Sequence, residues 1–126
     1  MTWDEIVSLL DRLLEDIRVT HHFDLHVELV CDFQGSYPKA RDFAQTDGQS
    51  IMLSPKIIGQ PYSRVAAILM HELGHILLMR SGDYTHTEIE TDQISEICFG
   101  VLIYYDIEGV QTLDAGVRPR PPHLPN

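Results

Sequence analysis

Apolar residues recur at three- and four-residue intervals over positions 2–19, the spacing that lines one face of an α-helix. Thr2 followed by Glu5 forms a capping-box pattern at its start, and Asp4 suits the positive end of a helix dipole. Over residues 25–33 the period changes to two, as in a strand with one buried face. This region therefore predicts an amphipathic helix followed by a strand.

Two further strands are predicted at about residues 40–45 and 50–53, because the Asp47-Gly48 pair between them is a strong hairpin signal. Together the strands predict a small, mostly antiparallel sheet. The Ser54-Pro55 pair then predicts the start of a short helical turn.

The second half of the chain predicts two helices. Residues 63–80 carry apolar side chains on nearly every side, a pattern typical of a helix that is buried within its domain. A second helix is predicted over residues 87–105, followed by a short strand at 110–113. The Pro-rich end of the chain predicts an extended segment.

These elements predict one α+β domain over residues 1–126, with its core at about 2–113 and a Pro-rich tail at 114–126. A chain of 126 residues can bury one real core but has little room for a second domain. Its apolar fraction of 44% and charged fraction of 22% are typical of a globular protein.

Charge and composition exclude several classes of function. The net charge of −10 argues against nucleic-acid binding, which depends on concentrated Lys and Arg. No apolar run approaches the roughly 18 residues of a membrane span, and no secretory signal precedes the first helix. Cys31 and Cys98 are interpreted as reduced thiols of a cytoplasmic protein, with one bridge between them as the alternative. The sequence does not indicate an oligomeric state.

The stretch MHELGHILL, residues 70–78, places His71 and His75 one turn apart in the predicted buried helix. Both rings project from one face and can reach the same ion, while Glu72 is offset toward a metal-bound water. Two neutral imidazoles and a carboxylate suit Zn²⁺, and a glutamate beside the water can act as general base and then acid. The alternative is a pair of hydrogen-bonded core histidines.

A catalytic zinc site needs a third protein ligand. One known pattern, with glycine three residues and histidine six residues after His75, is excluded by the residues at those positions. Glu88, thirteen residues after His75, shares one face of the second predicted helix with Asp92. Glu88 is predicted to be the third ligand, and Asp92 to accept the outer N–H of a ligand histidine, His71.

Glu88 also has a structural alternative. Thr85 followed by Glu88 is one capping-box pattern, which would use Glu88 at the helix start. Thr87 followed by Glu90 is an equally good pattern and leaves Glu88 at the first helical position. Glu90 is disfavoured as the ligand because Ile94 stands where an orienting acid would be needed.

The motif His-Glu-x-x-His followed by Glu-x-x-x-Asp on a second helix resembles the pattern of gluzincin metallopeptidases. The short gap and small size are similar to minigluzincins and to ImmA/IrrE-type regulatory peptidases, and the resemblance covers about residues 40–105. Residues 88–95 match the charged positions of the E-x-E-A-D-x-F-A pattern and differ at its small and aromatic positions. The resemblance implies a zincin-like fold, with a small sheet packed on an active-site helix and a glutamate helix.

The resemblance also implies where substrate binds. In such folds the edge strand before the active-site helix receives a peptide as an added strand. Residues 50–54 match that strand here. The predicted substrate contacts are therefore Ile51, Met52 and Leu53.

Other polar and aromatic residues have no spacing that assigns them a role. A metallopeptidase also needs a donor for the oxyanion of its tetrahedral intermediate. The candidates for this donor are Tyr84, His86, Tyr104 and Tyr105. A second group of histidines is interpreted as a solvated turn and strand face: His21, His22 and His26.

The sequence thus predicts a zinc-dependent metallopeptidase with one Zn²⁺ per chain and a peptide or protein as substrate. We expect a specific or regulatory enzyme, with activity held latent by the tail if the tail lies in the cleft. The alternative is a non-catalytic zinc-binding module with a zincin fold. Glu72 argues against the module, since a purely structural site does not need that acid.

Overall fold

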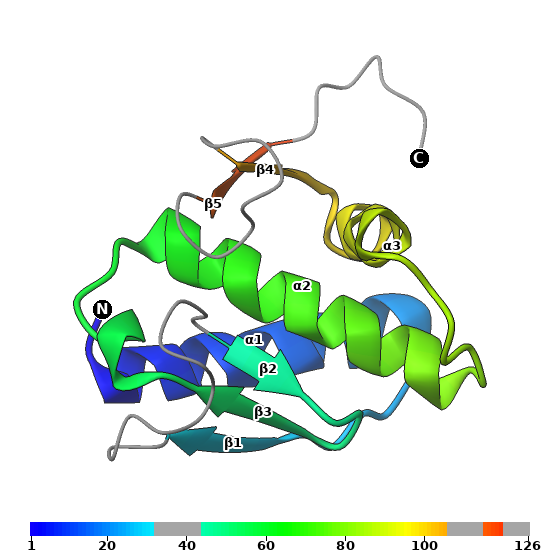
Figure 1. Ribbon diagram of the computed structural model, residues 1–126, viewed down its shortest axis with the longest axis horizontal. Helices are drawn as coiled ribbons and strands as arrows, with labels where there is room; N and C mark the ends of the chain where they lie inside the picture. The colour runs from blue at the N-terminus through cyan, green and yellow to red at the C-terminus, as the bar shows by residue number, and fades with distance from the viewer. Residues whose placement is uncertain (32–43, 106–114, 120–126) are drawn as a thin grey trace.

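The computed structural model describes three stretches of the chain, residues 1–31, 44–105 and 115–119. A long helix, α2 (Tyr62–Arg80), lies between a three-stranded sheet and a two-stranded sheet (Figure 1). Helix α1 (Trp3–His21) packs beside α2, and α3 (Glu88–Phe99) packs across α2 and also contacts α1. Among the described residues, the fold is therefore a small α+β arrangement built around α2.

Helix α1 confirms the helix predicted from the N-terminal period. The hydroxyl of Thr2 accepts a hydrogen bond from the Glu5 amide at 3.2 Å, and the Glu5 carboxylate accepts one from the Thr2 amide at 2.9 Å. This capping box satisfies two amides that the helix itself leaves unpaired. The buried face of α1 consists of Ile6, Leu9, Leu10, Leu13 and Ile17.

The three-stranded sheet has mixed pairing. Its strands are β1 (Glu28–Cys31), β2 (Ala44–Thr46) and β3 (Ser50–Leu53), in the order β1-β3-β2. Strand β2 runs antiparallel to β3, as expected, but β1 runs parallel to it. The prediction of a mostly antiparallel sheet is therefore wrong, because alternation identifies a buried face but not the neighbour or direction of a strand.

A tight hairpin joins β2 and β3 at the predicted place. The Asp47 carboxylate accepts hydrogen bonds from the amides of Gln49 and Ser50, at 2.9 and 2.8 Å. Gly48 follows Asp47 with a φ of 96°, a conformation that favours glycine. Residues 40–43 of the predicted first strand lie outside the described residues. The predicted helical turn is confirmed as a short 3₁₀ helix, η1 (Pro55–Ile57).

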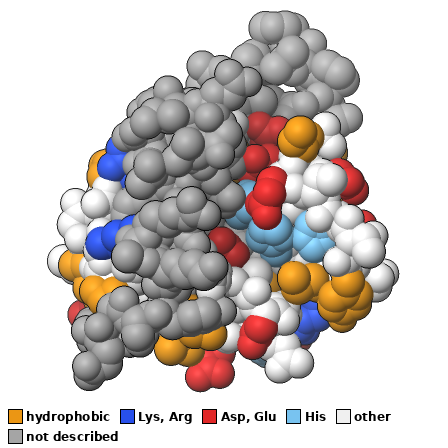
Figure 2. Space-filling view, viewed as in Figure 1, with side chains coloured by type: hydrophobic (Ala, Val, Ile, Leu, Met, Phe, Trp, Pro, Cys, Tyr) orange, Lys and Arg blue, Asp and Glu red, His pale blue; other side chains and the backbone are white. Residues whose placement is uncertain are grey.

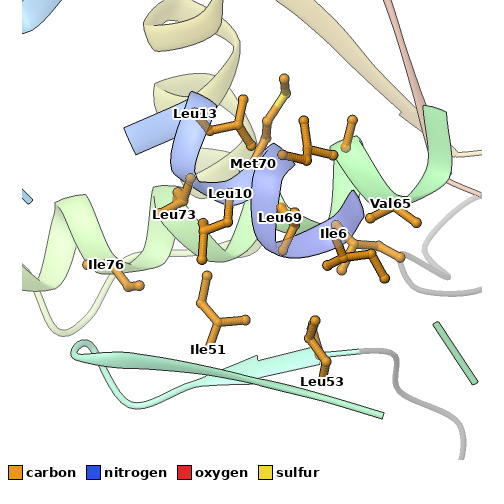
Figure 3. Packing of buried hydrophobic residues seen from close by; sticks show 14 of the residues in the cluster. Ile6, Leu10, Leu13, Ile51, Leu53, Val65, Leu69, Met70, Leu73 and Ile76 are labelled. Carbon is orange, nitrogen blue, oxygen red and sulfur yellow. The ribbon is translucent and has the colours of Figure 1, made fainter. Parts of the chain in front are cut away.

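The hydrophobic core lies between α1, α2 and the inner face of the sheet (Figure 3). Ile51 and Leu53 point from β3 toward α1 and α2, and neither side chain is exposed. Burying such a side chain contributes roughly 1.5–3 kcal/mol. The α2 residues facing this core include Val65, Leu69, Leu73 and Ile76. The inner face of the sheet thus fixes the position of α2.

The second predicted helix is shorter than expected. Helix α3 ends at Phe99, where Gly100 adopts a φ of 68° and its amide donates to the Glu96 carbonyl at 2.9 Å. The chain then forms strand β4 (Val101–Tyr105). The helix predicted to residue 105 is wrong at this end, because a left-handed glycine stops the helix and the β-branched and aromatic residues after it suit a strand.

Strand β4 pairs antiparallel with β5 (Ala115–Pro119), which also packs along α2. Strand β5 lies within residues 114–126, the segment that the sequence predicts as a Pro-rich tail. The strand predicted at 110–113 lies outside the described residues. Neither Cys31 nor Cys98 takes part in a disulfide bond among the described residues. No helix in the part of the chain that the structure describes has the length and apolar character needed to cross a membrane.

Candidate metal centre

The HELGH segment lies in the middle of α2, where residues 65–74 are all buried. This confirms that a helix apolar on every side is an interior one. His71 is 2% exposed, Glu72 is 4% exposed, and the His75 side chain is 16% exposed. Ionisable groups at such depth need partners that offset the loss of water.

Gly74, between the two histidines, lets α3 approach α2 closely. A Cβ atom at this position would lie 2.3 Å from Ser95 Oγ and 2.6 Å from the Thr91 carbonyl oxygen. The Ser95 hydroxyl donates a hydrogen bond to the Met70 carbonyl at 2.6 Å, which joins the two helices at this contact. This contact was not predicted from the sequence. The pattern that could have indicated it is a glycine on one helix together with two small polar residues, Thr91 and Ser95, four apart on the other.

The start of α3 uses one of the two capping boxes that the sequence offered. The Thr87 hydroxyl accepts from the Glu90 amide at 3.1 Å, and the Glu90 carboxylate accepts from the Thr87 amide at 3.4 Å. Thr85 is instead held by the Asp83 carboxylate, which accepts from its amide at 3.0 Å. Glu88 therefore stands at the first position of α3, with its carboxylate free of the cap.

Three potential ligand atoms converge between α2 and α3. Glu88 Oε2 lies 2.7 Å from His71 Nε2 and 3.2 Å from His75 Nε2. All three ligand atoms lie within 4.8 Å of one another. Ligand atoms about 2.0 Å from a tetrahedral zinc ion are roughly 3.3 Å apart, so this group matches the size of such a site. The structure thus brings together a His/His/Glu group that could hold a metal ion.

His71 has a carboxylate on its outer side. Its Nδ1 lies 2.7 Å from Asp92 Oδ1, and because an ionised carboxylate only accepts, Nδ1–H is the donor. Its buried Nε2 makes no hydrogen bond among the described residues, although Glu88 Oε2 lies 2.7 Å away. A buried ring nitrogen in this state suits a metal ion.

His75 has a different outer partner. Its Nδ1 lies 2.7 Å from His86 Nε2, and the other ring nitrogen of His86 lies 2.9 Å from the Asp83 carbonyl oxygen. The Thr91 hydroxyl oxygen is 3.3 Å from the same His75 Nδ1. His86 was one of the candidates for the oxyanion donor, but in the structure both of its ring nitrogens make contacts within the protein.

The charges of the group perturb its pKa values. Burial lowers the pKa of His71, but the hydrogen bond with Asp92 and the contact with Glu88 outweigh burial and raise it to about 9. The contacts with His71 and His75 hold the pKa of the Glu88 carboxyl well below its usual range. Because metal ligands must be deprotonated, a metal ion bound to this group would displace the proton between His71 Nε2 and the Glu88 carboxylate.

The structure does not place the predicted substrate strand at a sheet edge. Strand β3 is the central strand, with β1 on one side and β2 on the other. The side chains of Ile51 and Leu53 are fully buried in the core, and Met52 between them is partly buried. The edge-strand prediction for these three residues is therefore wrong, because both hydrogen-bonding edges of β3 are occupied.

The other candidates lie in varied settings. Tyr84 is 74% exposed in the loop before α3, and Tyr104 and Tyr105 belong to strand β4. His21 lies at the end of α1, with its Nε2 3.0 Å from the Cys98 carbonyl oxygen. Among the described residues, only His71, His75 and Glu88 form a group of this kind with ligand atoms so close together.

On the face seen in Figure 2, histidine side chains gather with acidic side chains around them. The same view shows apolar side chains close by. Comparisons with models of protein families, with curated proteins and with solved structures found no match to this chain.

Proposed function

We propose that this chain is a zinc-dependent metallopeptidase that hydrolyses a peptide or protein substrate, in a specific or regulatory role. The observation that carries the proposal is the convergence of His71, His75 and Glu88 beside the buried Glu72. Two imidazoles and a carboxylate form the donor set of a known class of catalytic zinc sites. The proposal also includes a zincin-like fold of the gluzincin type.

The residues at the site fit a zinc ion. His71 presents a buried Nε2 without a hydrogen-bond partner among the described residues, and its opposite nitrogen is fixed by Asp92. The Glu88 carboxylate supplies negative charge and is still 66% exposed, so the group is open to solvent on that side. A closed structural site would have a fourth protein ligand, and none joins this group among the described residues.

Glu72 is the residue that we assign to proton transfer. A bound zinc ion would polarise a peptide carbonyl and lower the pKa of water toward about 7. Glu72 follows His71 directly and is buried, so its carboxylate is held in a setting of low polarity. In this role it takes a proton from water and passes it to the leaving amine. Asp92 orients the His71 ring throughout.

The proposal is tested by metal analysis and by one conservative variant. Purified wild type should carry one zinc ion per chain, and Glu88→Ala should lose most of it. Glu72→Gln should retain zinc but hydrolyse a mixed peptide pool about 100-fold or more slowly, as measured by mass spectrometry. Wild type without zinc would overturn the proposal. A zinc-loaded wild type with no more hydrolysis than Glu72→Gln would favour the non-catalytic module.

The proposal extends to latency through the end of the chain. Residues 115–119 form β5 and belong to the fold, so a blocking role falls to residues 120–126, which lie outside the described residues. Deleting residues 120–126 leaves β5 in place and should raise hydrolysis if these residues block the cleft. Unchanged hydrolysis, with unchanged access of a chelator to zinc, would remove latency from the proposal.

A further inference from the structure

We infer that His86 is a positioning residue for His75, and that it holds the His75 ring with its proton on Nδ1, which leaves the lone pair of Nε2 for the zinc ion that His75 and Glu88 would share. This inference rests on the proposed zinc site and names a residue that completes it. The contact between the two rings brings Nδ1 of His75 within 2.7 Å of Nε2 of His86.

The direction of this hydrogen bond follows from the far side of His86. Its Nδ1 lies 2.9 Å from the Asp83 carbonyl oxygen, which can only accept, so this nitrogen must carry a proton. A neutral imidazole has one N–H, so Nε2 of His86 is bare and accepts. Nδ1 of His75 is then the donor, and Nε2 of His75 is left bare.

Thr91 gives the same direction independently. Its hydroxyl proton goes to the Thr87 carbonyl, 2.9 Å away, so toward His75 its oxygen can only accept. That oxygen lies 3.3 Å from His75 Nδ1. Two acceptors from different parts of the chain, His86 and Thr91, therefore face the same ring nitrogen. Both contacts require a proton on Nδ1.

The loop that carries His86 is folded back against the end of α2. Gly82 has a φ of 97°, and its amide donates to the Met79 carbonyl at 3.0 Å. The Asp83 amide donates to the Leu78 carbonyl at 2.9 Å, which fixes the residue that accepts from His86. The His86 ring is thus positioned by the same helix that carries His75.

The two ligand histidines therefore have unlike outer partners. His71 donates to the carboxylate of Asp92, whereas His75 donates to a neutral ring. A carboxylate draws positive charge onto its partner more strongly than an imidazole does. His86 thus fixes the orientation and tautomer of His75 without adding a further negative charge to a group that already contains Glu88 and Asp92.

The test compares two variants of the full chain that differ in one property. His86→Gln keeps an acceptor oxygen near the place of Nε2, whereas His86→Leu has similar size and no acceptor. Zinc affinity, measured by competition with a chelator, should fall about 10- to 100-fold in His86→Leu and remain near wild type in His86→Gln. His26→Ala, at an exposed histidine paired only with Asp24 in the described residues, serves as the control.

Nitrogen-15 NMR of the histidine rings gives a second result that needs no zinc. The measurement uses the metal-free Glu88→Ala chain, which lacks the carboxylate 3.2 Å from His75 Nε2. In this chain the proton of the neutral His75 ring should reside on Nδ1, and it should stay there when His86→Gln is added. Adding His86→Leu should give a mixture of tautomers. Equal zinc affinity of the Gln and Leu variants, or a neutral His75 ring protonated on Nε2 in the Glu88→Ala chain, would overturn the inference. If wild type fails to bind zinc, the proposed function fails, while the ring spectrum still decides the role of His86.

Discussion

His71 and Glu88 belong to one ligand group, yet His71 is 2% exposed in the middle of α2 and the Glu88 side chain is 66% exposed at the first position of α3. The histidine belongs to α2, the helix that packs on α1 and the sheet to form the core. The glutamate is held by a helix cap and by the contact of α3 with Gly74.

The α2 half and the α3 half of the site are therefore held in place by different interactions. Packing fixes the α2 half whether or not a metal is present, because burial of apolar neighbours sets that helix in place. The α3 half depends on local hydrogen bonds at a helix start, where backbone order is weakest. A metal ion held by both halves would tie the exposed half to the buried one.

The largest effects should come from removing one ligand from each half. Zinc binds to sites with four ligands with a free energy of about 10–16 kcal/mol, which is roughly 3 kcal/mol for each ligand. His71→Ala and Glu88→Ala should therefore each lower zinc affinity about 100-fold. In the metal-free chain the two should differ. His71→Ala should lower the free energy of unfolding by about 2–4 kcal/mol, through the cavity and the lost hydrogen bond with Asp92, and Glu88→Ala by much less.

Chemical denaturation of the two metal-free variants, with wild type beside them, measures this difference. An equal loss of stability in His71→Ala and Glu88→Ala would show that the buried half is no more fixed than the exposed half.

Zinc itself should order the start of α3. At a free zinc concentration of 100 times Kd, the bound state gains about 2.7 kcal/mol, which corresponds to about 100-fold slower opening. Hydrogen exchange of the amides at 90–92 should slow by up to this factor. Amides at 19–21, the end of α1, open without releasing zinc and serve as the control. Equal change at both places would contradict a local effect.

Gly74→Ala should separate the two helices. The added Cβ would lie 2.3 Å from Ser95 Oγ and 2.6 Å from the Thr91 carbonyl, so the helices must shift, at a cost of about 1–3 kcal/mol in stability. Zinc affinity should fall as well, because the shift moves Glu88 away from the histidines. Gly59→Ala is the matched control, since its Cβ would meet no atom within 4 Å and adds only backbone strain. Similar zinc affinity in both variants would count against this contact.

The smallest effect should come from the helix caps. Thr2→Ala and Thr87→Ala each remove a capping box and should each lower stability by about 1 kcal/mol. Only Thr87→Ala should also weaken zinc binding, because its cap places Glu88. Thermal unfolding and chelator competition measure the two effects. Equal zinc affinity in the two variants would show that the cap does not position the ligand.

Much of the arrangement could be predicted because it is local in the sequence. The period of apolar residues identified α1 and α2, and spacing alone paired His71 with His75 on one helix face. Thr87 and Glu90 form the capping box of α3 and lie three residues apart. The start of this helix could therefore be predicted from short-range hydrogen bonding.

The remainder depends on which segments meet, and no local period contains that information. The parallel pairing of β1 with β3 needs a choice of neighbour that alternation does not make. The contact between His75 and His86 depends on how Gly82 turns the loop back toward α2. The end of α3 was missed because apolar residues after Gly100 fit a helical stripe as well as a strand.

The contact at Gly74 has an evolutionary consequence. The two positions between Glu72 and His75 are not equivalent, because Leu73 faces the core while the position of Gly74 admits no side chain. Selection for this helix crossing would preserve glycine there and small residues at positions 91 and 95, even in descendants in which the His/His/Glu group had changed. The ancestry of this fold would then be recorded in three small residues, and not only in its ligands.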